Sequence, residues 1–354
     1  MTTTNRSRSI SRRSLMAGAA GIAGAGALGA FVPRHAHAAG SMVLGTWGGD
    51  YARLLSENVE QPLLEPEGVQ VVHDIGGDPE RRAKLLAERR LPRGTTDLQA
   101  LSAAGSYEMS AQDVLQPVDY GQIPNASHLL DKMSTDYAVG HIYSGKVILY
   151  NPDLVDPAPS RFADLWNPAY QGQVGIIDIQ YQFTLLAAAL GAGGGVDDFE
   201  PGKEKLLELR DMGMKMYPTN EAMAQALQVG EVGLCIMWKA RAVQWQNAGV
   251  PVIAVGAEEG VPLYVSDFCV PKNAPNPELA HAYLNAMLDP SAQERFAETM
   301  GYNPTVANAQ VPPETQERIG FTKEEQERLV QPDYRYLAER DSELKEWWDK
   351  VFKA

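Results

Sequence analysis

The chain has 354 residues, of which 44% are hydrophobic, and it carries a formal net charge of −14 at pH 7. This length suits about two domains at the usual ~150 residues each, and the composition argues against general disorder. The excess of acids argues against nucleic acid as a partner, because nucleic-acid binding rests on lysine and arginine that neutralise phosphates.

The first 38 residues have the layout of a signal peptide. A basic head with four arginines precedes an uncharged Ala/Gly-rich run over 15–31, and Ala36-His37-Ala38 supplies a small-x-small cleavage site. We therefore expect residues 1–38 to be removed, which raises the negative charge from −14 to −19 because five arginines and no acids leave. The alternative is a membrane anchor, but the run is weakly apolar for the ~20 residues that a membrane-spanning helix needs.

Export predicts a periplasmic protein. The paired Arg12-Arg13 is typical of a twin-arginine (Tat) export signal. Leu15 stands where that pattern more often has Phe, so the Sec route stays open.

Strands and helices alternate after the signal peptide. Apolar runs predict one strand that ends at Trp47 and two more over 69–74 and 96–102. Helical patterns fall between them, and Asp78-Pro79 opens the second helix with proline at its first position. This order predicts a parallel α/β sheet.

The stretch 160–184 follows another predicted strand, over 146–151. It predicts a short helix, a turn at Gly172, a buried strand over 174–177 and the start of a helix. Asp178 stands at the carboxyl end of that strand, which is where open α/β sheets bind their ligands.

Strands and helices continue to the end of the chain, with no internal repeat and no linker between independent domains. Strands are expected over 233–238, 252–255 and 262–271, and helices over 204–212, 220–228, 242–248, 279–288, 292–300 and 339–352.

The two cysteines, Cys235 and Cys269, have no metal-ligand spacing. Export makes a disulfide chemically possible. Both residues lie in apolar strand-like runs, however, which favours two buried free thiols. The sequence predicts no metal site and no cofactor.

Several segments, taken in order, resemble the bacterial periplasmic binding proteins for spermidine and putrescine, which feed ABC importers. The resemblance covers nearly all of the mature chain. It rests on Trp47 with Tyr51, on 162–172, on 230–232 leading to Trp238, on 268–274 and on the loop 301–305.

This family implies a type II periplasmic binding fold, in which two α/β lobes, each a mixed and mostly parallel sheet flanked by helices, are joined by crossover strands. The ligand lies in the cleft between the lobes, and a hinge closes over it. The chain is then expected to leave the first lobe near 143–150 and to return near 264–271. The implied division is residues 39–146 plus 268–354 for lobe 1 and 147–267 for lobe 2.

A polyamine site needs aromatic faces for methylene and ammonium groups, and carboxylates for the charges. The resemblance implies these site residues: Trp47 and Tyr51 as a first-lobe aromatic pair, Ser102 as a hydroxyl, Asp178 as a carboxylate, Trp238 as the large second-lobe aromatic, and Tyr264 where a tryptophan is usual.

The sequence departs from the polyamine pattern at two positions. Tyr181 lies where the polyamine proteins carry a second acid, and Ser266 lies where they carry a key aspartate, with Asp267 next to it. A shift of one residue on an extended strand turns a side chain to the opposite face. In addition, Lys239 and Arg241 follow Trp238 closely, and a cation beside the site repels a polyamine but pairs with a carboxylate.

Two ligand hypotheses follow for one function. The first is a polyamine held by Asp178 and Asp267. The second is a zwitterionic ω-amino acid such as 4-aminobutyrate, with Lys239 or Arg241 on its carboxylate and one of the two acids on its amine. Either ligand would be delivered by a monomer to the membrane permease subunits of an ABC importer.

Simpler roles compete with these assignments. Trp47 and Trp238 could be plain core residues, Asp178 a helix cap, and Lys239 and Arg241 solvated charges.

Other function classes also compete. A secreted hydrolase or lyase is one, but the sequence has no Gly-x-Ser-x-Gly elbow, no His-Glu-x-x-His helix and no evident histidine partner for either cysteine. We therefore expect a protein that is not an enzyme and has no catalytic residue. A sensor subunit that passes its ligand state to a membrane receptor is a third class, because the same closed form could serve either partner.

Overall fold

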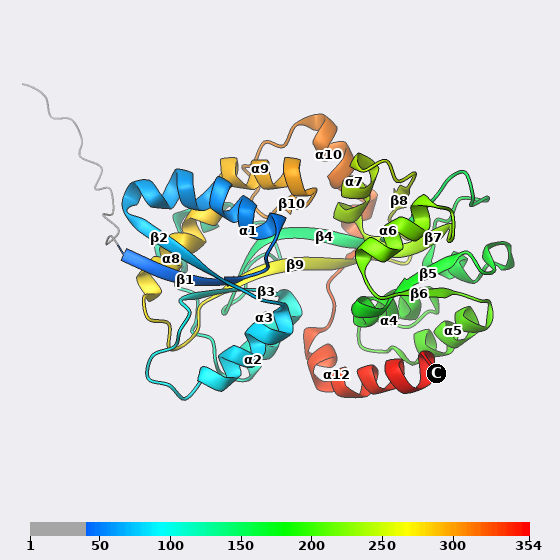
Figure 1. Ribbon diagram of the computed structural model, residues 1–354, viewed down its shortest axis with the longest axis horizontal. Coiled ribbons are helices and arrows are strands. Elements are labelled where there is room, and N and C mark those ends of the chain that lie inside the picture. Colours follow the sequence, from blue (N-terminus) through cyan, green and yellow to red (C-terminus); the bar gives the residue numbers. More distant parts are fainter. Residues whose placement is uncertain (1–39) are drawn as a thin grey trace, which may run out of the picture. The chain divides into compact units, whose positions relative to one another are not determined.

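The computed structural model describes residues 40–354 (Figure 1). The expected signal peptide, with its twin-arginine pattern and cleavage site, lies outside the described residues. Among the described helices, none combines the length and the apolarity that crossing a membrane requires.

Lobe 1 is built on a parallel core of three strands. β1 (Gly40–Thr46) lies between β2 (Val69–Ile75) and β3 (Leu98–Ser102) and is parallel to both. The three strands fall where the apolar runs predicted them, with ends that differ by one or two residues.

Helices connect these strands. α1 (Asp50–Leu55) continues as a π-helix over Ser56–Leu64, and α2 (Asp78–Glu88) follows β2. α3 (Ala103–Ala111) follows β3 directly. The sequence pattern did not predict α3, because its small and polar residues carry no clear apolar stripe.

Two long strands join the lobes, as the type II fold requires. β4 (Val139–Tyr150) pairs with β9 (Val261–Cys269) through Gly145, and then with β7 (Leu234–Trp238) from Lys146 onward. β9 also pairs with β3, so β9 and β4 connect the lobe 1 strands to the lobe 2 strands within one sheet. Figure 1 shows β4 and β9 side by side in the middle of the fold. The predicted crossovers are therefore confirmed, although β4 begins seven residues earlier than the expected strand over 146–151.

Lobe 2 continues the sheet in the order β4, β7, β5, β6. Its strands are β5 (Val174–Ile177), β6 (Lys215–Tyr217), β7 and β8 (Ile253–Val255). Its helices are α4 (Tyr181–Gly191), α5 (Glu200–Asp211), α6 (Asn220–Gln228) and α7 (Lys239–Asn247). The bounds of β5 and α6 are those predicted from the sequence.

The C-terminal part of the chain contributes to both lobes. Its elements are α8 (Pro277–Met287), α9 (Pro290–Met300), β10 (Asn303–Pro304), α10 (Pro313–Ile319), α11 (Lys323–Glu327), β11 (Leu329–Val330), α12 (Tyr334–Trp347) and a final π-turn at Trp348–Phe352. α8 and α9 bury their apolar faces in the core of lobe 1. Leu337 and Leu344 of α12 are buried with the core of lobe 2.

The lobe boundaries given in the sequence analysis stay a prediction. α12 contacts both lobes, because Leu337 and Leu344 are buried in the core of lobe 2 while Tyr334 packs against Tyr107 of α3 in lobe 1.

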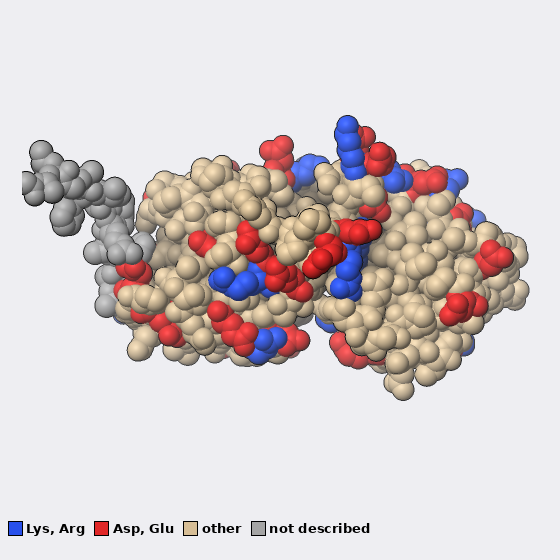
Figure 2. Space-filling view, turned by 90° about the horizontal axis from the view of Figure 1, so that it is seen from above, with Lys and Arg blue, Asp and Glu red and all other residues tan. Residues whose placement is uncertain are grey.

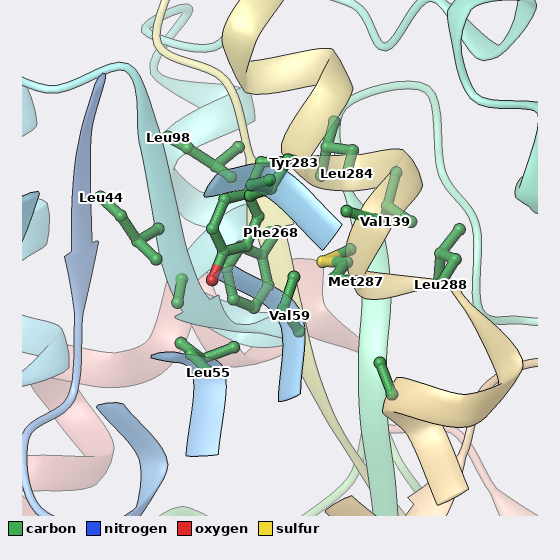
Figure 3. Close-up of a cluster of buried hydrophobic side chains, with 14 of the residues drawn as sticks. Leu44, Leu55, Val59, Leu98, Val139, Phe268, Tyr283, Leu284, Met287 and Leu288 are labelled. Carbon is green, nitrogen blue, oxygen red and sulfur yellow. The ribbon is translucent and has the colours of Figure 1, made fainter. Parts of the chain in front are cut away.

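The core of lobe 1 fixes the elements that surround the site. Phe268 of β9 stacks on Tyr283 of α8 with ring centroids 5.8 Å apart, and Leu55 and Val59 pack against the same cluster (Figure 3). This packing holds α1 against β9, and both elements carry cavity residues.

Cys235 and Cys269 are free thiols, and both are buried. The prediction of two buried free thiols is therefore confirmed.

Candidate functional site

A cavity of about 470 Å³ lies between α1, α6, α7, the end of α9 and the crossover strands. Residues from both lobes line it. Five of them are aromatic, and they are Trp47, Tyr51, Trp238, Tyr264 and Tyr302.

The lobe 1 wall is a pair of perpendicular rings. Trp47 follows β1 and Tyr51 lies in the first turn of α1, and their centroids are 5.2 Å apart. The Arg81 guanidinium lies 4.4 Å from the centroid of the Trp47 ring and is fixed in turn by a bond from its Nε to the Ala100 carbonyl at 3.1 Å. A buried cation therefore holds the orientation of Trp47.

Hydrogen bonds from neighbouring side chains fix the Tyr51 hydroxyl. It bonds to His141 Nδ1 at 2.9 Å and approaches Ser266 Oγ at 3.4 Å. Burial raises the pKa of Tyr51 well above its usual value and lowers the pKa of His141 to about 3. Both rings are therefore neutral at pH 7.

The opposite wall is a row of aromatic rings. Trp238 ends β7 and lies 4.9 Å from Tyr264 of β9, centroid to centroid. Phe183 meets Trp238 edge-on at 4.6 Å, and Tyr302 lies 6.2 Å from Tyr264. Such a row offers apolar surface to methylene groups and ring faces to a cation.

Two charged side chains are among the lining residues of the described chain, one of each sign. Asp50 is at the open end, since 77% of its side chain is exposed, and it pairs with Arg53 at 3.1 Å. Arg241, in the first turn of α7, donates from Nη1 to Gln244 Oε1 at 2.8 Å. Its Nε is buried and finds no partner within residues 40–354. The cavity therefore holds a guanidinium whose hydrogen-bonding capacity is not used up.

Neutral polar groups complete the lining. They are Asn220 at the start of α6, Gln244 of α7, Ser266 of β9 and Thr299 near the end of α9.

In the face seen from above, acidic and basic side chains gather together toward the middle (Figure 2). The excess of acids is therefore not a single acidic patch on this face.

Of the ten side chains that the sequence analysis proposes as ligand contacts, the structure brings five to the cavity and places five elsewhere. Trp47, Tyr51, Trp238, Tyr264 and Arg241 line it. The five that do not are Ser102, Asp178, Tyr181, Lys239 and Asp267.

Asp178 and Tyr181 contact the C-terminal segment. The Asp178 carboxylate accepts bonds from Trp348 Nε1 at 2.7 Å and Lys353 Nζ at 2.8 Å. The Tyr181 hydroxyl donates to Asp341. The sequence carries no signal for these contacts, because the partners lie about 160 to 175 residues further along the chain.

Lys239 turns away from the cavity. Its ammonium donates to the Gly320 carbonyl and lies 3.5 Å from the Glu325 carboxylate. Burial lowers the pKa of Lys239, and Glu325 partly opposes that shift.

Ser102 is a helix cap rather than a lining residue. Its Oγ donates to Asp78 at 2.7 Å and accepts from Gly105 N at 3.2 Å at the start of α3.

Ser266 and Asp267 lie on opposite faces of β9, as strand alternation requires. Ser266 lines the cavity, whereas Asp267 is 6% exposed and is not among the lining residues. Burial raises the pKa of Asp267 to about 7.

Five of the lining residues were not predicted from the sequence, and they are Asp50, Asn220, Gln244, Thr299 and Tyr302. Tyr302 could have been predicted, because it lies in the loop 301–305 that carries part of the family resemblance. Gly301 ends α9 in the left-handed conformation, with φ at 74°, and so turns Tyr302 back toward β9.

Comparison with known proteins identifies the family. The sequence profile described as "bacterial extracellular solute-binding protein" matches residues 62–323. The spermidine/putrescine-binding periplasmic proteins of Escherichia coli K12 and Salmonella typhimurium LT2 are each 28% identical over 291 residues, which cover 76% of this chain and 83% of the relative.

Solved structures agree with the fold. The Atu4243–GABA receptor has a TM-score of 0.79 at 22% identity, covering 89% of this chain and 98% of its own. The spermidine/putrescine substrate-binding protein PotD of Streptococcus pneumoniae has a TM-score of 0.71 at 22% identity, covering 86% of this chain and 99% of its own. With two lobes, two crossover strands and a profile match over most of its length, this chain belongs to the family of bacterial extracellular solute-binding proteins.

Proposed function

We propose that this protein captures a small amine-containing ligand, such as putrescine or spermidine, in the cavity between its lobes and delivers it to the permease subunits of an ABC importer. The observation that carries the proposal is the meeting of Trp47 and Tyr51 from lobe 1 with Trp238 from lobe 2 in one cavity. An ammonium over such a ring gains about 0.5–1 kcal/mol when exposed and about 2 kcal/mol when desolvated. The spermidine/putrescine-binding relatives support the same ligand class.

Capture would work by hinge closure. The ligand-facing rings belong to different lobes, so drawing the lobes together around a bound amine removes water from both walls. The ligand would leave chemically unchanged, and the protein would act as a monomer in the periplasm after cleavage of residues 1–38. Turnover of the amine, or a dimer in size-exclusion chromatography coupled to light scattering, would contradict these parts of the proposal.

Arg241 supports a second candidate ligand, a zwitterionic ω-amino acid. A guanidinium matches the geometry of a carboxylate and forms strong charge-assisted bonds to it. The Arg241 side chain lines the cavity, and its Nε has no partner within residues 40–354, so the guanidinium keeps hydrogen-bonding capacity for a carboxylate. The exposed Asp50 could accept the amine. The two carboxylates expected for a polyamine, Asp178 and Asp267, lie outside the cavity lining. The Atu4243–GABA receptor among the structural neighbours supports the same candidate.

A thermal-shift panel of putrescine, spermidine and 4-aminobutyrate tests the function. A specific ligand at about 100 times its Kd stabilises the folded protein by about 2.7 kcal/mol. The absence of a shift with every amine would contradict the proposal.

Arg241→Gln separates the two ligands. Loss of a hydrogen bond to a charged group costs about 1.5–3 kcal/mol, so 4-aminobutyrate should bind about 10- to 150-fold more weakly. Putrescine should bind as well or better, because a cation has been removed from the wall. Arg90→Gln is the matched control, since Arg90 is exposed and lies outside the lining, and it should leave both affinities unchanged.

A further inference from the structure

A fully buried lysine lies behind the lobe 2 wall of the cavity. Lys146 of β4 is 0% exposed, and it pairs directly with Trp238 in the ladder between β4 and β7. Its Nζ lies 4.2 Å from the centroid of the Trp238 ring. The ammonium therefore touches a residue that lines the cavity without lining the cavity itself.

Lys146 also connects to the cavity through two amides. Its Nζ donates to Gln180 Oε1, and Gln180 Nε2 donates to Asn220 Oδ1 at 2.7 Å. Gln180 is buried, whereas Asn220 lines the cavity. A single chain of hydrogen bonds therefore runs from the buried ammonium to the cavity wall.

The direction of this chain is set by the lysine. An ammonium has three donors and no acceptor, so Gln180 must turn its oxygen toward Lys146. The NH₂ group of Gln180 then donates to Asn220, which accepts this hydrogen bond through its side-chain oxygen. The NH₂ group of Asn220 is left as the free end of the chain, and it can donate to an acceptor on a ligand.

Lys146 has no carboxylate partner in the described part of the chain that would explain it as a structural ion pair. Among residues 40–354, no ion pair joins it to an acid, and burial lowers its pKa to about 7. The neighbouring titratable groups are Cys235 of β7 and Tyr264 of β9, which packs on the same Trp238 ring. Burial raises the pKa of both, to about 12 for the thiol, so both stay neutral. A buried charge without a partner is costly for folding, and this favours a role in the site over a role in stability.

We propose that Lys146 is a positioning residue for ligand binding, which braces the Trp238 ring and, through Gln180, aims the amide of Asn220 into the cavity. This inference rests on the proposed function of the cavity and on its second candidate ligand, because the carboxylate of an ω-amino acid can accept the bond from Asn220, whereas a protonated polyamine has no acceptor. Loss of the lysine proton removes the cation over Trp238. A neutral amine can also accept a hydrogen bond, so Gln180 is then free to reverse. Binding should therefore weaken as pH rises through about 7.

Isothermal titration with putrescine and with 4-aminobutyrate tests the inference on the full mature protein. The variants are Lys146→Met, Asn220→Ala and the double variant, each measured at pH 6 and pH 8. At pH 6 we expect each single variant to bind 4-aminobutyrate about 5- to 10-fold more weakly than the wild type binds it. The double variant should lose less than the product of the two single losses, because Lys146 acts partly through Asn220. Wild-type affinity should fall from pH 6 to pH 8, and the affinity of Lys146→Met should stay flat.

Two controls separate positioning from folding. Lys203→Met removes another buried lysine, whose Nζ lies 5.8 Å from the centroid of the Trp347 ring. Neither Lys203 nor Trp347 lines the cavity, so this variant should change neither the ligand affinity nor its dependence on pH. Asp267→Asn removes a second group that titrates near pH 7, and this variant should show the same dependence of ligand affinity on pH as the wild type. Thermal unfolding should show Lys146→Met to be folded at both pH values.

The outcomes are distinct. If the wild type binds neither probe, the proposed function fails, and the inference fails with it. If the wild type binds putrescine but not 4-aminobutyrate, the proposed function stands and the inference fails. If the wild type binds but Lys146→Met binds equally well, or if the two single losses simply multiply in the double variant, Lys146 is not a positioning residue. A pH profile that disappears in Asp267→Asn instead of Lys146→Met would overturn the inference in the same way.

Discussion

Trp238 and Tyr264 lie 4.9 Å apart, centroid to centroid, although one ends a strand of lobe 2 and the other lies on the crossover strand β9. This contact joins the cavity wall to the element that links the lobes. A residue of the cavity wall is therefore in direct contact with the crossover strand.

Trp238→Ala should weaken ligand binding by about 5- to 30-fold, since the variant loses ring-face and apolar contacts worth about 1–2 kcal/mol. Trp238→Phe should recover part of the loss, because it restores a smaller ring. Titration calorimetry with the best amine of the thermal-shift panel measures both. Equal affinity in Trp238→Ala and wild type would show that the ring is only a core residue.

Tyr51→Phe should affect stability more than binding. The variant keeps the ring but removes the hydroxyl that bonds to His141, and leaving a buried polar atom unpaired costs about 1–3 kcal/mol. We expect a lower midpoint in urea unfolding and a change in ligand affinity of less than about threefold. A large loss of affinity with unchanged stability would instead place the hydroxyl on the ligand.

Asp178→Asn tests whether this residue serves the ligand or the fold. Burial alone would raise the pKa of Asp178, but the bonds from Lys353 and Trp348 outweigh it and lower the pKa. The charged carboxylate is therefore stabilised by the C-terminal segment, and its loss should cost about 1–2 kcal/mol of unfolding free energy. Ligand affinity should stay within about twofold of the wild type. A tenfold loss of affinity would return Asp178 to the list of ligand residues.

Asp267 predicts a pH dependence of stability. Its folded pKa is raised to about 7, so the folded state binds its proton more tightly than the unfolded state does. The stabilisation is fully present below the unfolded value of about 4 and is lost as pH rises through about 7. Asp267→Asn should remove this loss and be the more stable protein at pH 8, by an amount on the order of a few kcal/mol. Chemical unfolding at pH 5 and pH 8 checks it, and an equal pH dependence in both proteins would contradict it.

Local patterns were enough to predict the elements that carry a clear apolar signal. β5 and α6 have the expected bounds, because a β-branched run and a capped amphipathic helix are decided by neighbouring residues. The first half of β4 was missed, since its residues include Gly140, His141, Ser144 and Gly145 and show no apolar alternation. That half becomes a strand because β9 pairs with it.

The site was harder to predict than the fold for the same reason. Trp47 and Trp238 stand next to strand ends, which a sequence pattern can locate. Asp178 and Lys239 stand at similar positions, but each forms an ion pair with a residue from a distant part of the chain. Asp178 pairs with Lys353, and Lys239 pairs with Glu325. Such competition depends on tertiary contacts, and no local pattern contains it.

β4 exchanges its partner strand across one peptide bond. Gly145 is the last residue paired with β9, and Lys146 is the first paired with β7. A side chain at position 145 would collide with Val261, since an added Cβ would lie 2.5 Å from Val261 Cγ1. The last residue paired with β9 and the residue that packs on Trp238 are thus consecutive on one strand. With no loop between them to absorb movement, a turn of one lobe against the other at this point would displace the tryptophan wall in the same motion.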